Sequence, residues 1–152
     1  MTVIKKDLGW KRIKAEMLKA HNLEVAVGVQ EGSTNAEGAS IAEYGAYNEY
    51  GTKDIPSRPF MATSFDDSRS KIDQDFQRAS DLLIAGQTTA RKALLEIGQK
   101  HALRIQAIIQ NTNFLPKLED STIKAKKGSN KTLVDTGALI NSIRPVVRKR
   151  GL

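Results

Sequence analysis

The chain of 152 residues contains no cysteine and few aromatic residues, and no apolar run approaches the roughly 20 residues that a membrane-spanning helix needs. The lack of cysteine excludes disulfides and thiolate metal sites and fits a reducing environment. The N-terminal MTVIKKDLGW has no apolar stretch, so we expect no secretory signal. We therefore expect one domain over residues 1–152 that is made in a cytoplasm and does not enter a membrane.

Side chains that bind metals or catalyse reactions are also scarce, and the only histidines are His21 and His101. His101 lies on the apolar stripe of a predicted helix without a His, Asp or Glu at helical spacing, which favours a packed histidine over a metal ligand. His21 follows a predicted helix, where a cation complements the helix dipole. Glycine-rich phosphate-binding loops are absent from the sequence. We therefore predict no catalytic residue, no metal site, no cofactor and no enzyme activity.

The segment LVDTGA, residues 133–138, resembles the active-site turn of retroviral-type aspartic proteases. Its surroundings do not fit that function, because too little chain follows for a flap and a second half of a barrel. The alternative is that Asp135 or Thr136 caps a helical turn that starts near Gly137. We favour the capping role.

Positive charge is concentrated in the last quarter of the chain. Residues 111–152 carry nine basic and three acidic side chains, whereas residues 1–110 carry fifteen and fourteen. A basic segment of this kind is either a solvated end or a contact for phosphate or an acidic partner. No aromatic residue follows Phe114, so base stacking is not expected there. The candidate phosphate contacts are Lys124, Lys126, Lys127, Lys131, Arg148, Lys149 and Arg150.

Hydrophobic periodicity predicts helices in the first and middle parts of the chain. The expected helices cover residues 8–20, 40–50, 60–85, 88–110, 117–126 and 137–142. In helix 8–20 we expect Trp10, Ile13, Met17 and Ala20 to share one apolar face. Ser40 with Glu43 forms a capping box, Gly51 stops that helix, and Thr88 is the expected cap of the second long helix.

The two long helices each carry an apolar stripe and are joined by a short turn at Gly86, which predicts an antiparallel hairpin. The first stripe consists of Met61, Phe65, Ile72, Phe76, Ala79 and Leu83. The second consists of Ala90, Leu94, Ile97, His101, Ile105 and Ile108. We expect these stripes to face the protein core.

Strand signals occur near both ends of the chain. Residues 23–29 alternate between apolar and other side chains, as in a half-buried strand, and residues 143–148 form a second strand that Pro145 confines to a sheet edge. We expect these strands to pair. The predicted fold is α+β, with two long antiparallel helices and short helices on a small, mainly antiparallel sheet. Residues 30–39 are a predicted mobile loop, and residues 144–152 form a basic C-terminal end.

All three tyrosines lie in one short segment, SIAEYGAYNEYGTKDIPSRPF. Tyr44, Tyr47 and Tyr50 are three residues apart, so on a helix they form a broad ridge along one side. One interpretation is that the ridge packs on the long helices with its hydroxyls in water. The other is a contact with another protein, because tyrosine combines apolar area with a polar tip and is enriched at interfaces. The sequence leaves both interpretations open.

The run IAEYGAYNEYGTKDIPSRPF resembles a signature of neck and tail-completion proteins of tailed bacteriophages: Asn-Glu-aromatic-Gly-Thr, then Ile-Pro-x-Arg-Pro-Phe. A later block, STIKAKKGSNKTLVDTGALINSI, is similar to that family's Ser-Thr-Ile, Lys-x-Gly-Ser and Leu-Ile/Val-Asp-Thr-Gly-x-Leu-x-x-Ser-Ile motifs in the same order. The strand VAVGV also fits, and the resemblance spans residues 23–147. One departure is Tyr47, where His or another residue is expected.

The resemblance implies a structural virion protein at the head–tail junction, synthesised in the host cytoplasm, that is not an enzyme. It implies a homo-oligomeric ring, with a hexamer favoured, and contacts with other neck, portal-adaptor or tail proteins. Non-specific contact with DNA in the channel is also implied. The alternative from another class is a small DNA-associated protein that uses the basic C-terminal quarter.

A ring requires a heterologous interface, in which one patch meets a different patch on the neighbour. We expect the tyrosine segment to supply one such patch, with Arg58 either paired with a carboxylate of the neighbour or folded back on its own subunit. The loop 30–39 and the basic end are expected to order on assembly. The candidate interface residues are Tyr44, Tyr47, Asn48, Tyr50, Arg58 and Phe60.

Overall fold

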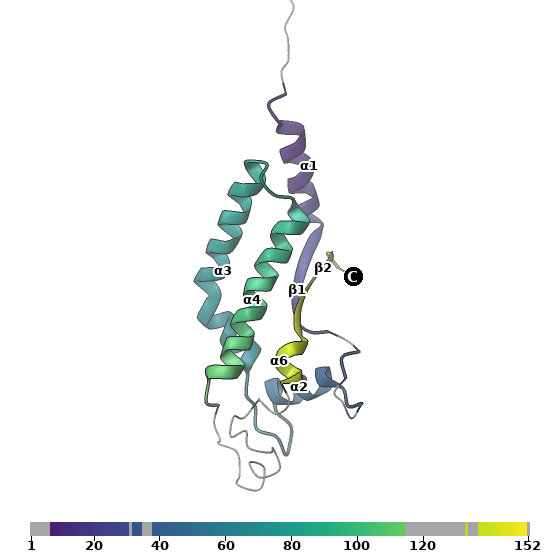
Figure 1. The fold of residues 1–152 in the computed structure, drawn as a ribbon, viewed down its shortest axis with the longest axis vertical. Coiled ribbons are helices and arrows are strands. Elements are labelled where there is room, and N and C mark those ends of the chain that lie inside the picture. The colour runs from purple at the N-terminus through teal and green to yellow at the C-terminus, as the bar shows by residue number, and fades with distance from the viewer. Residues whose placement is uncertain (1–6, 31, 35–37, 115–132, 134–136, 152) are drawn as a thin grey trace, which may run out of the picture.

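In the computed structural model, which describes residues 7–30, 32–34, 38–114, 133 and 137–151, the chain forms helices and a two-stranded sheet (Figure 1). The elements are α1 (Trp10–His21), β1 (Leu23–Val29), α2 (Ile41–Tyr50), α3 (Phe60–Ile84), α4 (Ala90–Asn111), α6 (Ala138–Ser142) and β2 (Ile143–Lys149). The predicted α+β fold is confirmed. The helix expected over 117–126 and parts of the loop expected over 30–39 lie outside the described residues. Within the described part, no helix is both long and apolar enough to cross a membrane.

The sheet joins the two strands predicted near the ends of the chain. β1 and β2 are antiparallel, with Leu23 opposite Lys149 and Val29 opposite Ile143. Pro145 lies opposite Val27. Each strand of a two-stranded sheet is an edge strand, so the missing N–H of a proline is tolerated there. The predicted pairing is therefore confirmed.

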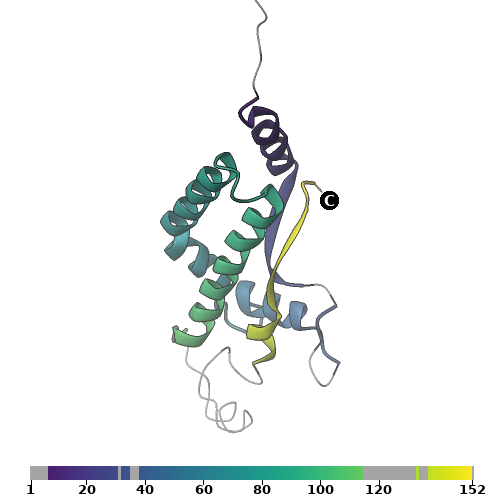
Figure 2. The ribbon, with the colours of Figure 1, turned by 45° about the horizontal axis from the view of Figure 1, so that its top comes forward.

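Helix α4 is the central layer of the fold, with α3 on one side and the sheet on the other (Figures 1 and 2). Gly98 on α4 is the point of closest approach to the sheet. A Cβ atom built at Gly98 would lie 2.5 Å from Cγ2 of Val25 and 2.7 Å from Cβ of Pro145. The helix can therefore lie on the strands only because this position has no side chain.

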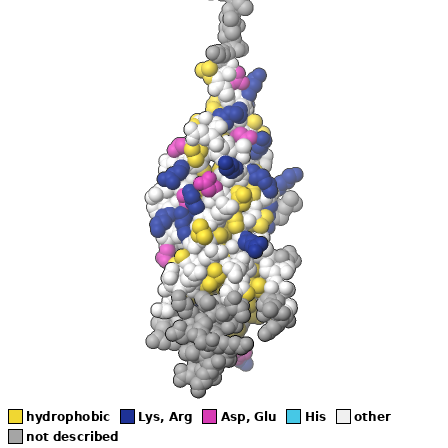
Figure 3. All heavy atoms as spheres, in the orientation of Figure 1, with side chains coloured by type: hydrophobic (Ala, Val, Ile, Leu, Met, Phe, Trp, Pro, Cys, Tyr) yellow, Lys and Arg dark blue, Asp and Glu magenta, His cyan; other side chains and the backbone are white. Residues whose placement is uncertain are grey.

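The core lies where α4, α6, the start of α3 and the sheet meet. Its buried members are Ile41, Phe60, Ala102, Ile105, Ile109, Leu133, Leu139 and Ile143. Of the predicted α4 stripe, Ala90, Ile97 and Ile105 are buried. Leu95 and Leu103 of α4 are exposed. Figure 3 shows that hydrophobic side chains gather near the middle of the face in view.

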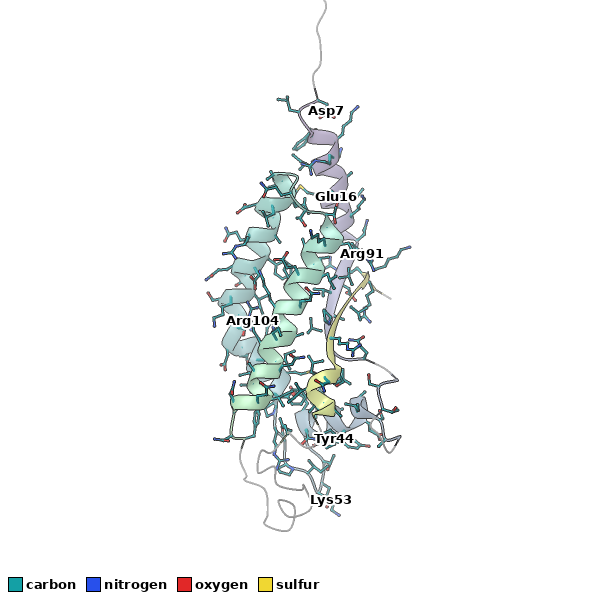
Figure 4. The ribbon with its side chains drawn as sticks, in the orientation of Figure 1. Asp7, Glu16, Tyr44, Lys53, Arg91 and Arg104 are labelled. Carbon is teal, nitrogen blue, oxygen red and sulfur yellow. The ribbon has the colours of Figure 1, made fainter. Side chains whose placement is uncertain are left out.

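The apolar stripe predicted for α3 is wrong in part. Phe65 and Phe76 are 45% and 44% exposed, whereas Ser64 and Ser68 are buried. Helix α3 instead faces α4 partly through charged groups. Asp75 accepts hydrogen bonds from Lys100 (3.0 Å) and from Arg104, which is labelled in Figure 4. Because this contact is polar, α3 is rotated and its phenylalanines turn toward solvent.

His101 lies beside this charged contact, with its ring edge-on to Phe65 at a centroid distance of 6.3 Å. The prediction of a packed histidine agrees with this position. Burial lowers the pKa of His101, and the charge of Arg104 lowers it further. The folded chain therefore favours the neutral imidazole.

Acid is expected to destabilise the α3–α4 contact in two steps. Because the folded-state pKa of His101 lies below its ordinary value of 6.5, stability should fall as the pH drops below that value. Burial alone would raise the pKa of Asp75, but the hydrogen bonds from Arg104 and Lys100 outweigh burial and lower this pKa below its ordinary value of 3.8. The stabilisation that Asp75 provides is therefore lost only when the pH falls below 3.8. Denaturation of wild type and His101→Gln from about pH 4 to 8 measures the first step. The variant should lack this step, and an unchanged pH profile would contradict the assignment.

Helix α1 was predicted to pack through Trp10, Ile13, Met17 and Ala20, but Trp10 and Met17 are exposed. The helix docks through polar groups instead. Arg12 donates to the carbonyl oxygens of Leu83 (3.4 Å) and Ile84 (3.2 Å) at the end of α3. The buried Glu16 carboxylate accepts from the N–H of Ala90 (2.9 Å) at the start of α4. A cation thus meets the C-terminus of one helix and an anion the N-terminus of the next, as their dipoles favour.

Two predicted caps have different outcomes. The side chain of Ser40 accepts from the N–H of Glu43 (3.2 Å), as predicted. Helix α4, however, is capped by Thr89, whose side chain accepts from the N–H of Lys92 (3.4 Å), and not by Thr88. Helix α4 begins at Ala90, so the N-cap position falls on Thr89, one residue after the predicted cap. The capping role proposed for Asp135 or Thr136 lies outside the described residues.

Candidate interaction site

The tyrosine helix α2 is defined at both ends by the residues that the sequence indicated. Ser40 caps its start, and Gly51 follows its end at φ 78°. The N–H of Gly51 donates to the carbonyl oxygen of Tyr47 (2.9 Å). A Cβ at position 51 would lie 2.9 Å from the backbone nitrogen of Ser57, so both the φ angle and the space require glycine.

The turn after α2 is held by its own backbone and short side chains. The N–H of Thr52 donates to the carbonyl oxygen of Ile55 (2.8 Å), and the Thr52 side chain accepts from Asp54 (3.3 Å) and Ile55 (3.0 Å). Ser57 donates from its hydroxyl to the carbonyl oxygen of Glu49 (2.8 Å). The chain therefore returns to the end of α2 in a fixed conformation before α3 begins.

Glu49 ties α2 to the start of α3. Its Oε2 accepts from the N–H of Met61 (2.8 Å) and its Oε1 from the N–H of Ala62 (2.9 Å). Pro59, at the N-cap position of α3, provides no side-chain cap. The first N–H groups of a helix have no partner within the helix, so the buried carboxylate supplies what the local sequence lacks.

Asn48, Arg58 and Phe60 were predicted at an interface, but the structure buries all three within the subunit, at 3%, 7% and 0% exposure. Asn48 donates from its side-chain amide to the carbonyl oxygen of Tyr44 (2.9 Å), and its own carbonyl oxygen accepts from the N–H of Arg58 (2.6 Å). These residues join α2 to the segment before α3. Of the two alternatives for Arg58, its burial agrees with folding back on its own subunit.

The three tyrosines form the exposed part of this region, which we call the tyrosine ridge (Tyr44, Tyr47 and Tyr50). They are 40%, 41% and 83% exposed. Tyr47 donates from its hydroxyl to the carboxylate of Glu43, which raises the pKa of Tyr47 because the hydrogen bond and the negative charge both favour the phenol. Figure 4 shows Tyr44 at the opposite end of the molecule from Asp7 and Glu16. The ridge is thus a rigid aromatic surface at one end of the subunit.

Three of the candidate phosphate contacts belong to the described residues and lie apart from the tyrosine ridge. Arg148 and Lys149 belong to β2, and the N–H of Arg150 donates to the carbonyl oxygen of Asn22 beside α1 (3.0 Å). Arg148 already pairs with Glu24 at 2.7 Å. The other four, Lys124, Lys126, Lys127 and Lys131, lie outside the described residues. Contact with phosphate stays a prediction.

Sequence reasoning missed Glu49, although a signal for it exists. A long helix that follows proline without Ser, Thr, Asp or Asn at its N-cap needs an acceptor from another part of the chain. The sequence does not show which acidic residue provides it. Across the described ranges, no group of three or more His, Cys, Asp or Glu side chains is arranged to hold a metal ion.

Comparison of the chain with models of known protein families, with curated proteins and with solved structures finds no match. The function is therefore inferred from the residues of this chain and their geometry. They provide an aromatic surface that is exposed, and a network of buried polar groups beneath it that holds the backbone in place.

Proposed function

We propose that this chain is a structural protein of a tailed-phage virion, a neck or tail-completion component at the head–tail junction. It assembles as a ring of identical subunits through protein–protein contacts and catalyses no reaction. The motif order described from the sequence suggests this role. The observation that carries it is that the most motif-rich segment builds an exposed tyrosine ridge on a buried scaffold.

The tyrosine ridge has the physical properties of a protein-binding surface. Tyrosine offers a large apolar area at a low cost in side-chain entropy, and its hydroxyl tolerates water before a partner binds. The bonds of Asn48 and Glu49 fix the backbone beneath the ridge. A surface that is already ordered loses less conformational freedom on association, so more of its contact energy appears as affinity.

The buried residues of the same segment explain why a binding surface and a folding motif share one stretch of sequence. Gly51 permits the tight turn, and Glu49 caps α3. Gly51 has no side chain to offer a partner, and the Glu49 carboxylate is buried against α3, so both support the backbone that carries the tyrosines. We therefore assign contact with other polypeptides to the tyrosines and support of the ridge to the buried residues.

Replacing Tyr44 and Tyr50 together with alanine is expected to leave a folded subunit that no longer assembles. Both rings are substantially exposed, so their loss removes contact area without opening the core. Mass measurement and negative-stain imaging of the purified protein report assembly, and circular dichroism reports folding. Trp10→Ala is the matched control, because Trp10 is an exposed aromatic residue on α1. Unfolding of the double variant, or assembly equal to wild type, would contradict the assignment.

A further inference from the structure

A hollow opens where the end of α1 meets the start of β1 and the end of β2, and its volume is about 520 Å³. The residues that line it are Leu18, Lys19, Asn22, Leu23, Lys149 and Arg150. Leu23 lies opposite Lys149 in the sheet, and the N–H of Arg150 donates to the carbonyl oxygen of Asn22 (3.0 Å). Backbone pairing therefore fixes the walls of the hollow, and its size is in the range that holds a small ligand or a large side chain.

The lining of the hollow is apolar and cationic, and none of its residues is acidic. Leu18 is 62% exposed, and Leu23 is half-buried. Lys19 already pairs with Glu16 at 2.6 Å. In the part of the chain that the structure describes, neither Lys149 nor Arg150 forms an ion pair through its side chain. An occupant of the hollow would thus meet a leucine wall and two unpaired cations.

Tyr50, at the end of the tyrosine ridge, has the matching shape and chemistry. It is the most exposed of the three rings, at 83%. The backbone on both sides of it is held, because Ser57 donates from its hydroxyl to the carbonyl oxygen of Glu49 (2.8 Å) and the N–H of Gly51 donates to the carbonyl oxygen of Tyr47 (2.9 Å). Tyr50 is therefore a projecting aromatic side chain on a fixed support.

We propose that Tyr50 of one copy of this chain inserts into the hollow of a second copy. The ring lies against Leu18 and Leu23, and the cations of Lys149 and Arg150 contact its electron-rich face. The tyrosine hydroxyl stays at the rim, where it can accept a hydrogen bond from either cation. This inference rests on the proposed self-assembly and deepens it, because it names the surface that the ridge meets.

One subunit cannot make this contact with itself. Figure 1 places α1 and α2 at opposite ends of the subunit, and Figure 4 shows Tyr44 of the ridge far from Glu16 of α1. Every copy therefore offers one ridge and one hollow, and the contact between copies is heterologous. Such a contact closes into a ring when the rotation between copies allows it. Trp10 lies eight residues before Leu18, about 12 Å along α1, so it stays outside this contact.

A second copy suits the hollow better than a nucleic acid does. A phosphate backbone would pair with Lys149 and Arg150 but would gain nothing from the leucine wall. A tyrosine uses both parts of the lining, because its edge is apolar and its face attracts cations.

A variant of the hollow tests this contact. Leu18→Glu with Arg150→Glu, the hollow variant, places two carboxylates where the ring would lie. We expect it to weaken self-association at least tenfold, measured by sedimentation velocity over a range of concentrations. Both side chains are exposed, so circular dichroism should show an unchanged fold. Leu103→Glu with Arg144→Glu is the matched control: it changes the charge equally at two exposed positions outside the hollow, and association should change less than about twofold.

Mixing two defective variants makes the test specific for this pair of surfaces. The hollow variant keeps its ridge, and Tyr44→Ala with Tyr50→Ala, the ridge variant, keeps its hollow. An equimolar mixture should form dimers and no larger species, because the remaining ridge and the remaining hollow of each dimer are both defective. Native mass spectrometry measures the masses, and each variant alone should be monomeric under the same conditions.

The outcomes separate this contact from the proposed function as a whole. Dimers on mixing, with loss of association in each variant alone, support the contact. A hollow variant that assembles like wild type, or a mixture without dimers, overturns it. If the hollow variant assembles and the ridge variant does not, the ring stands and only this contact fails. A wild-type chain that stays monomeric overturns both. Loss of duplex DNA binding by the hollow variant with unchanged self-association would assign the hollow to phosphate and overturn the contact.

Discussion

Replacing Gly98 with alanine is expected to lower the free energy of unfolding by about 2–3 kcal/mol. The new Cβ would lie 2.5 Å from Val25 and 2.7 Å from Pro145, well inside van der Waals contact. Valine is stiff at χ1 and proline is a closed ring, so neither side chain can move away. Helix α4 must therefore shift from the sheet, and this shift would loosen the packing of both strands. Equilibrium denaturation with a chemical denaturant measures the loss.

Gly45→Ala is the matched control for this change. Gly45 is also inside a helix, but its Cβ would lie 3.4 Å from Leu139 and 3.6 Å from Val29, which is ordinary contact. Alanine is favoured over glycine in a helix by about 1 kcal/mol, and both variants gain this term. Gly45→Ala should therefore be neutral or stabilising while Gly98→Ala is destabilising. Equal effects of the two substitutions would show that α4 does not approach the sheet as closely as the structure has it.

The features that sequence predicted well are those that depend on neighbouring residues. Alternation in LEVAVGV identified a strand that is as long as predicted, and Ser40 and Gly51 mark the ends of α2 correctly. The pairing of β1 with β2 could be predicted because these are the two strand signals in the sequence. Local periodicity and capping chemistry act within a few residues, so one sequence is sufficient to find them.

The features that sequence could not supply depend on distant partners. Helix α1 is amphipathic, yet it docks through Arg12 and Glu16 onto ends of α3 and α4 that lie more than seventy residues away along the chain. The apolar periodicity of α3 predicted a buried face with Phe65 and Phe76, because no pattern shows that Asp75 meets Lys100 and Arg104. In both cases a polar contact between elements overrides the hydrophobic pattern of a single helix.

In the candidate site too, the sequence predicted local features but not the contacts with distant residues. The sequence located the tyrosine ridge, and its three rings are 40%, 41% and 83% exposed. Contact of these rings with another protein stays a prediction. It also assigned Asn48, Arg58 and Phe60 to the same surface because they belong to the same motif. A motif of contiguous letters cannot distinguish residues that form a surface from residues that support it. Burial makes that distinction, and it places these three inside the subunit.

Replacing Glu49 with alanine is expected to lower the free energy of unfolding by about 3 kcal/mol, an effect at the upper end for a single polar side chain. The carboxylate accepts from the N–H groups of Met61 and Ala62, and both bonds are charge-assisted. Its removal leaves the two donors without their acceptor at a partly buried helix start. Glu49→Gln keeps one oxygen acceptor but loses the charge, so about half of the effect should remain. Chemical denaturation measures both variants.

A second glutamate and amide hydrogen exchange distinguish the loss of the Glu49 cap from the loss of a negative charge in general. Glu96→Ala removes an exposed glutamate whose ion pair with Lys100 is weak, so it should cost no more than about 0.5 kcal/mol. In Glu49→Ala, amide hydrogen exchange should accelerate at Met61 and Ala62, whereas the N–H of Ala90, bound to Glu16, should stay protected. In the proposed assembly, this variant should also associate more weakly than wild type, because the carboxylate contact between α2 and the start of α3 is lost. An energetic cost equal to that of Glu96→Ala, or unchanged exchange at Met61 and Ala62, would show that Glu49 does not support the ridge.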